Sequence, residues 1–194
     1  ITGLALSMAV CLLLIMMIKD ANSYDKFHPY SNRVYRINTE ALRKGGGTEP
    51  YASSPYIVGA TLASSYTGIE TWTMLNSGTT ADIAVDDRKF NFNIRFTNAD
   101  FFKIFGFTFK EGSAASSNEP TNVVLTKELS EKLFPKGNAI GPPVHVRGLG
   151  LFHLTGVLNQ FPGKTHFQFD ALGSFATIPA LEKSNSVTPT TNNW

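Results

Sequence analysis

Few side chains in this sequence have the type and spacing that chemistry requires. No pair of histidines forms a metal-ligand motif such as H-E-x-x-H, and no G-x-S-x-G elbow marks a serine nucleophile. The only cysteine, Cys11, lies inside an apolar run, so the polar remainder has no thiol for redox or nucleophilic chemistry. Asp86-Asp87 is better explained by a turn than by a carboxylate pair. We therefore expect no enzyme activity, metal site or bound cofactor here. The four histidines are His28, His145, His153 and His166.

Neither nucleic-acid binding nor a phosphate-binding loop is indicated by the sequence. The formal net charge is +2, and the Lys and Arg residues are scattered rather than clustered, so we expect no nucleic-acid binding. Residues 44–50 read KGGGTEP. No Lys-Ser/Thr pair follows the glycines, as it does in a phosphate-binding loop. This segment is therefore predicted to be the flexible tip of a hairpin.

The apolar run at the start of the chain is the strongest single feature. Residues 1–18 carry no charge, and as a helix they would be about 27 Å long, close to the roughly 30 Å hydrocarbon core of a bilayer. We predict a transmembrane helix and stalk over residues 1–24, followed by one domain over residues 25–194. Two alternatives stay open: a signal peptide cleaved near Ala21-Asn22-Ser23, and a core helix of a soluble domain. The first residue is not Met and no closing signal ends the chain, so we expect a piece of a longer protein.

The residues after the run are predicted to form the membrane boundary. Tyr24 and Phe27 are aromatic residues of the kind that favours the membrane–water interface, and Pro29 is predicted to end the helix. The sequence gives His28 no partner. Because charge counting fails for long translocated domains, it does not decide on which side of the membrane the domain lies. The candidate boundary and coupling residues are Lys19, Asp20, Tyr24, Asp25, Phe27, His28 and Pro29.

The first half of the polar body alternates between strand and helix signals. Residues 33–41 alternate in polarity, which predicts a strand. A helix is expected to follow, with Ser54 as N-cap, Pro55 at its first position and Gly68 at its end. Residues 71–109 have the composition of strands, with a hairpin turn at residues 86–88. One face of the second strand of that hairpin is predicted to carry Phe90, Phe92, Ile94 and Phe96, and the other Asn91, Asn93 and Arg95.

The second half contains shorter units of the same kind. A helical turn capped by Asn98 or Asp100 is expected first. A strand and then a helix are predicted over residues 122–134, with Thr126 as N-cap and Pro135 as terminator. Two strands joined at residues 148–150 follow. Because strands and helices are interleaved in short units, the predicted fold class is α+β rather than a doubly wound parallel sheet.

Four segments carry a specific resemblance when they are taken in order. They are SYDKFHPYSNRVYRIN after the apolar run, FTNADFFKIFGFTFKEG, NVVLTKELSEKLFPKGNAIGPPV and LTGVLNQFPGKTHFQFDALGSF. Together they resemble the MacB/FtsX-like family of ABC transporter permeases over residues 1 to about 176. Asp20 and Asp25 keep the acidic character of the family's stalk. Gly141-Pro142 departs from the glycine-lysine pair usual in the family, which is expected to reshape a loop only.

The resemblance implies a permease subunit of an ABC transporter in the bacterial inner membrane. In such proteins the first helix runs outward and continues as a stalk, which couples the membrane helix to a domain in the periplasm. That domain has a porter-like α+β part and a β-rich part, and residues 90–109 would belong to the latter. ATP would be bound by a separate cytoplasmic ATPase and not by this chain. Further implied partners are a second permease copy or paralogue, the lipid bilayer and a periplasmic adaptor.

Two functions from other classes stay open at this stage. The same helix would suit the ligand-binding sensor domain of a membrane receptor. A secreted or anchored binding protein would require cleavage near Ser23. The transported substrate cannot be read from the sequence.

Overall fold

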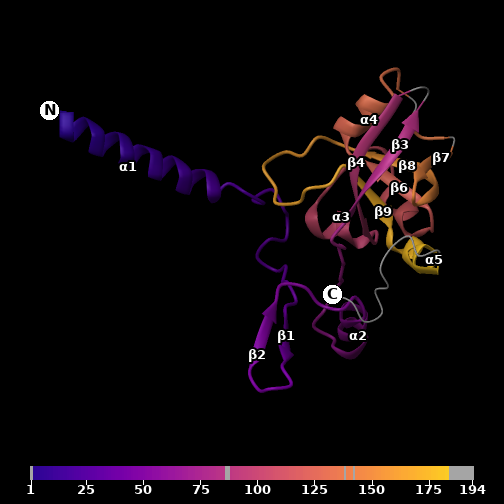
Figure 1. Cartoon of the computed structure of the whole chain (residues 1–194), viewed down its shortest axis with the longest axis horizontal. Helices are drawn as coiled ribbons and strands as arrows, with labels where there is room; N and C mark the ends of the chain where they lie inside the picture. The colour runs from indigo at the N-terminus through magenta and orange to yellow at the C-terminus, as the bar shows by residue number, and fades with distance from the viewer. Residues whose placement is uncertain (1, 86–87, 138, 142, 184–194) are drawn as a thin grey trace.

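A long exposed helix leads into a β-rich body and a smaller projecting arm (Figure 1). The computed structural model describes residues 2–85, 88–137, 139–141 and 143–183. Helix α1 spans Thr2–Ala21, and none of its residues is buried. Its apolar window has a mean hydropathy of 2.1, and within the described residues it is the one helix long and apolar enough to cross a membrane. The absence of burial contradicts the alternative of a core helix, because a core helix packs its apolar side chains inside the domain.

The arm, residues 30–72, consists of a hairpin and a short helix. Strands β1 (Thr39–Leu42) and β2 (Thr48–Tyr51) pair antiparallel, and the predicted glycine tip joins them. The strand predicted over residues 33–41 was wrong for its first six residues. The partner strand β2 is only four residues long, so residues 33–38 have no strand to pair with. Tyr35 is 87% exposed, so the apolar side of the alternation is not buried either. The predicted strand therefore forms only from Thr39.

Helix α2 (Ile57–Ser65) confirms the predicted helix but not its caps. Its N-cap is Tyr56, which makes no side-chain capping bond, so the assignment of Ser54 and Pro55 to the cap was wrong. The amide of Val58 bonds the carbonyl of Pro55 at 3.1 Å, so a tight turn precedes the helix and moves its start by two residues. The helix also ends before Gly68, at Ser65.

The body is built on one seven-stranded sheet of mixed direction, with the strand order β5-β8-β6-β9-β4-β3-β7. An additional pairing joins β7, at one end of this order, to β8, the second strand from the other end. Six strands thus form a closed ring of pairings. Strand β5 pairs with residues 156–158 of β8, beyond the residues 150–153 that pair with β7. The strands are β3 (Thr79–Val85), β4 (Arg88–Thr97), β5 (Phe109–Gly112), β6 (Asn122–Leu125), β7 (Pro143–Arg147), β8 (Gly150–Leu158) and β9 (Ala171–Ser174).

The strands predicted after residue 71 are confirmed for the two hairpins. Strands β3 and β4 form the predicted hairpin, and Asp86-Asp87 at its turn lie outside the described residues. Strands β7 and β8 pair antiparallel across the predicted connection at residues 148–150. Strands β6 and β8 run parallel, as do β4 and β9, whereas their other neighbours are antiparallel. The mixed sheet confirms the α+β class. Pro142 also lies outside the described residues.

Short helices close the body. Thr126 caps α4 (Lys127–Leu133) by accepting a bond from the amide of Leu129, as predicted. Helix α3 (Asp100–Phe105) has Ala99 as N-cap, so neither Asn98 nor Asp100 caps it. The Asn98 amide instead donates to the carbonyl of Trp72 and holds the segment before β3. The remaining elements are the 3₁₀ turns η1 (Ala114–Asn118) and η2 (Phe175–Thr177) and helix α5 (Ile178–Lys183).

Two apolar clusters fill the body on opposite faces of the sheet. The inner cluster contains the predicted stripe of β4, and Ile94 and Phe96 are fully buried there with Phe152. The outer cluster is aromatic and packs α3 and the loop before β9 on the other face. Residues 90–109 lie in β4, in α3 and at the start of β5. The division into a porter-like part and a β-rich part stays a prediction. The buried residues of the outer cluster are Phe101, Phe102, Phe107, Val124, Leu158, Phe169 and Leu172.

Candidate functional site

The predicted boundary residues lie where α1 meets the body. The chain leaves α1 through tight turns, in which the amide of Asn22 bonds Ile18 and that of Ser23 bonds Asp20. Asp25 then takes a left-handed backbone conformation with φ of 56°, which Asp tolerates better than most residues. We call residues 22–29 the stalk segment. The helix has already ended at Ala21, so the prediction that Pro29 terminates it was wrong.

The carboxylate of Asp25 is the centre of the junction. Its Oδ2 lies 2.5 Å from Nδ1 of His166, and its Oδ1 accepts the backbone amide of His166 at 3.2 Å. The other neighbour is His28, whose Nε2 lies 3.2 Å from Oδ1. Burial raises the pKa of Asp25, but the hydrogen bonds from His166, Thr165 and His28 outweigh it and lower the pKa to about 2. Asp25 is therefore ionised at neutral pH and joins the stalk segment to the loop before β9.

His28, for which the sequence indicated no partner, is buried and has two polar contacts. Only 7% of the residue is exposed, and its Nδ1 lies 2.7 Å from the carbonyl oxygen of Phe105 at the end of α3. Because a carbonyl oxygen only accepts, Nδ1 carries a hydrogen. The ring also lies among aromatic rings, with centroids 5.1 Å from Phe105 and 5.8 Å from Phe167. His28 thus fixes the stalk segment to two separate parts of the body.

A second set of contacts lies on the solvent side of the junction. Lys164 forms an ion pair with Asp20 in the last turn of α1, and its ammonium lies 5.7 Å from the centre of the Tyr24 ring. The ring of Tyr24 is 4.5 Å from that of His166. The hydrogen bond from Lys164 to Asp20 raises the pKa of Lys164. Water screens exposed pairs of this kind, so this set mainly orients the loop.

The last two predicted residues pack against the body. Phe27 joins the outer cluster, with its ring centre 5.9 Å from that of Phe107. It is therefore a packing residue of the domain, and its position at the membrane boundary stays a prediction. Pro29 lies against Gly106, where a Cβ atom would come within 2.6 Å of the proline ring. Gly106 has φ of 70°, so both its backbone and this close approach require glycine. Lys19 lies in the last turn of α1 and is exposed.

Sequence reasoning missed the body's half of this site. Its members are Phe105, Lys164, Thr165 and His166, and the ion pairs join residues 144 and 141 positions apart in the sequence. No local pattern marks them, because PGKTH has the composition of an ordinary loop. Only the segment LTGVLNQFPGKTHFQFDALGSF, which carries part of the family resemblance, pointed to this loop at all.

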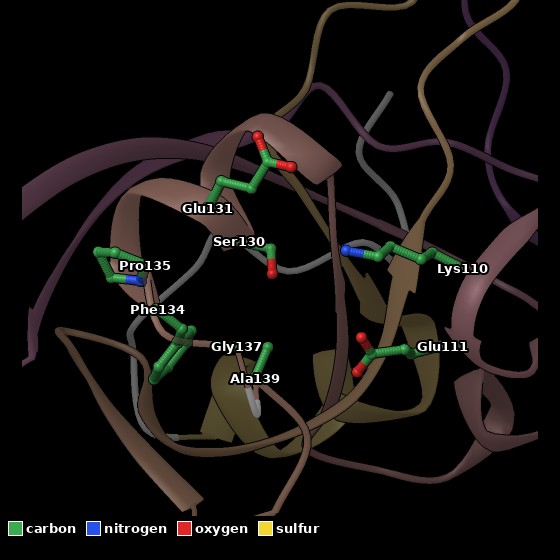
Figure 2. Close-up of a pocket in the computed structure, with 8 residues that line it drawn as sticks. All are labelled: Lys110, Glu111, Ser130, Glu131, Phe134, Pro135, Gly137 and Ala139. Atoms are coloured by element: carbon green, nitrogen blue, oxygen red, sulfur yellow. The ribbon is translucent and has the colours of Figure 1, made fainter.

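Two cavities accompany these features. The smaller, of about 220 Å³, lies at the junction and is lined by Asp25, His28, Ser31, Val34, Phe105 and Phe167. The larger, of about 400 Å³, lies between β5 and the end of α4 (Figure 2). In it the side chain of Lys110 extends from β5 toward α4, the hydroxyl of Ser130 points toward Gly137 and Ala139, and Phe134 and Pro135 form an apolar wall. Within the described residues no group of three or more His, Cys, Asp or Glu side chains is placed to hold a metal ion.

Comparisons with known proteins agree with this architecture. The sequence profile of the MacB-like periplasmic core domain matches residues 1–193. A domain of a protein described as a permease, from Porphyromonas gingivalis, superposes with a TM-score of 0.63 at 17% identity, over 81% of this chain and 65% of that chain. The periplasmic region of MacB from Actinobacillus actinomycetemcomitans gives a TM-score of 0.50 at 18% identity, over 76% of this chain and 60% of that one.

At these identities the two structures show a shared fold alone. The chain spans less than two thirds of the length of either one. A search of curated proteins gave no significant match.

Proposed function

The chain belongs to the family of MacB-like periplasmic core domains, and on this premise we propose that it is part of the permease subunit of an ABC transporter. In this proposal α1 spans the bacterial inner membrane and the body lies in the periplasm. A separate cytoplasmic ATPase binds and hydrolyses ATP, and α1 transmits its motion to the body. A second permease copy or paralogue, the lipid bilayer and a periplasmic adaptor are the other proposed partners.

One observation carries the coupling role: the stalk segment is bonded to the body and is not a free linker. Asp25 and His28 connect it to the loop before β9 and to the end of α3. Phe27 adds contacts with the outer cluster. A flexible linker would absorb a tilt or shift of α1, because its end-to-end distance varies freely. A segment held at three places passes such a movement on to the sheet.

The membrane role is supported by the surface of α1. Its large apolar residues are about half to two-thirds exposed, for example Leu6 at 69% and Met17 at 67%. A helix that is apolar on all sides is stable only where lipid or protein covers it. Its 20 residues give a length of about 30 Å, which matches the hydrocarbon core.

The test is an insertion of Gly-Gly after Asn22 in the complete permease, reconstituted with its ATPase. Insertion at this point separates α1 from the bonds made by Asp25 and His28. We expect transport, or the ATP-driven movement of the periplasmic domain, to be lost while the ATPase still hydrolyses ATP and the permease still inserts into the membrane. The matched control is the same insertion after Gly46, at the exposed hairpin tip, which should leave both activities intact. Unchanged transport in the Asn22 insertion would rule out the coupling role.

A further inference from the structure

The loop between β8 and β9, residues 159–170, reaches back toward the end of α1 (Figure 1). Its middle part is tied to the last turn of α1 by Lys164 and to the stalk segment by His166. The tip consists of Pro162, Gly163 and Lys164, and all three are exposed. The loop is therefore held beside the helix and presents an exposed tip there.

The depth of this tip relative to the membrane follows from α1. The last residue before the charges is Ile18, and Asp20 lies about 3 Å further along the helix axis. The headgroup layer extends about 5–8 Å beyond the hydrocarbon core on each side of a bilayer. Asp20 therefore lies within that layer when α1 spans the membrane. Since the ammonium of Lys164 contacts the carboxylate of Asp20, Lys164 lies at the same depth.

The chemistry at this depth suits phospholipid headgroups. The ammonium of Lys164 has three hydrogens, and its side chain is 53% exposed despite the ion pair. Its hydrogen bond with Asp20 raises its pKa, so it stays charged. Lys19 is exposed in the same turn of α1, and Tyr24 lies next to Lys164. Ammonium groups bind phosphate, and tyrosine favours the headgroup level.

We propose that the tip of this loop lies in the headgroup layer of the outer leaflet, where the ammonium groups of Lys164 and Lys19 bind phospholipid phosphates. This inference rests on the proposed function, which places α1 across the membrane and the body outside. It gives the body a second contact with the membrane, in addition to the covalent one through the stalk segment. Any tilt of the body toward or away from the bilayer then has to move this loop through the headgroups.

The experiment measures depth with a fluorescent label on single cysteines. In the Cys11→Ser background, Pro162→Cys places a nitrobenzoxadiazole label at the loop tip. His145→Cys is the control, because it is exposed on β7, on the side of the body away from α1 (Figure 1). The chain is reconstituted in nanodiscs of phosphatidylcholine and phosphatidylglycerol that contain a headgroup-nitroxide lipid. We expect a clear loss of fluorescence at position 162 and little or none at position 145.

A label on the native Cys11, in nanodiscs with an acyl-chain nitroxide lipid, separates this inference from the proposed function. Quenching at position 11 with equal, weak quenching at positions 162 and 145 overturns the loop contact and leaves the membrane span standing. Absence of quenching at position 11 overturns the span and the loop contact together.

Two further variants test the lysine–phosphate contact itself. In the Pro162→Cys chain, Lys164→Gln removes the ammonium and Asp20→Asn removes only its partner in the ion pair. We expect Lys164→Gln to reduce headgroup quenching at position 162 and Asp20→Asn to reduce it less. Equal reductions would mean that the ion pair alone positions the loop, and would overturn the contact with phosphate. Lys132→Gln, at an exposed position in the last turn of α4, is the matched control and should change nothing.

Discussion

The body and the arm of this protein are folded by different means. From Ala81 onward the body contains two dozen buried apolar side chains, and 22 of them form two clusters, one on each face of the sheet. In the arm, residues 30–72, no residue is buried. Several of its large apolar side chains are exposed, with Tyr35 at 87% and Leu42 at 85%, and others are only half-buried. Only the body therefore has the apolar burial that makes a tertiary structure stable by itself.

The arm is held by local bonds and a few contacts with the body. A two-stranded hairpin and a nine-residue helix are each marginal in water on their own. The ring of Tyr56 lies 5.3 Å from that of Phe175, and a Cβ on Gly59 would lie 2.4 Å from the ring of Trp72. Arg33 pairs with Glu70 on the surface. Substitutions should therefore change the free energy of unfolding by different amounts in the two regions. The stalk segment is intermediate between them in burial.

The largest effect is expected in the body. Phe101→Ala removes a fully buried ring from the outer cluster, and we expect it to lower the free energy of unfolding by about 3–5 kcal/mol. Tyr35→Ala, in the arm, should change it by less than about 0.5 kcal/mol, because that side chain is almost fully exposed. Urea unfolding of both variants in detergent, followed by near-ultraviolet circular dichroism, makes the comparison. Similar losses for the two variants would refute the distinction between the regions.

An intermediate effect is expected in the stalk segment, and it depends on pH. Since the folded-state pKa of Asp25 is lowered from 3.8 to about 2, its contribution to stability is present above pH 3.8 and is lost as the pH falls toward 2. After allowance for partial exposure, that contribution is about 1–2 kcal/mol. Asn tolerates the same left-handed backbone as Asp. The Asp25→Asn variant should therefore lose this amount of unfolding free energy at neutral pH, and its stability should fall less than that of the parent between pH 4 and 2.

The control for that experiment is Asp82→Asn. It keeps an oxygen that can accept the bond from Asn91 on the exposed face of the β3–β4 hairpin. We expect a change below about 0.5 kcal/mol at neutral pH. If the Asp25 and Asp82 variants followed the same curve between pH 4 and 2, the bonds at Asp25 would not contribute to stability.

The smallest effect is expected in the arm. Glu49 pairs with Arg43 across the hairpin at 2.8 Å, and the two side chains are 40% and 63% exposed. Glu49→Gln should lower the free energy of unfolding by about 0–1 kcal/mol, since water screens such a pair. The dependence on salt gives the check: added salt should narrow any gap between variant and parent. A loss above that range would show that the arm depends on this pair more than its burial suggests.

Predictions that depend only on residues close together in the sequence were confirmed. The alternation of Phe90, Phe92, Ile94 and Phe96 predicted one face of β4, and the Thr126 cap predicted the start of α4. Both signals depend only on residues within one strand or one turn. The cap at Ser54 was wrong because a tight turn moves the start of α2, and the cap at Asn98 was wrong because its side chain bonds a carbonyl 26 residues away. Capping residues predict a helix better than they predict its first residue.

The sequence by itself determined the apolar helix, the α+β class and the family resemblance, since these depend on composition, periodicity and the order of motifs. Only the tertiary structure decided that Asp20 and Asp25 meet Lys164 and His166, that His28 is buried against Phe105, and that Phe27 packs into the body. The reason is physical: these contacts join segments more than 70 residues apart, and which segments meet is set by the closure of the sheet. The coupling site exists only once the sheet has placed the loop before β9 next to the end of α1.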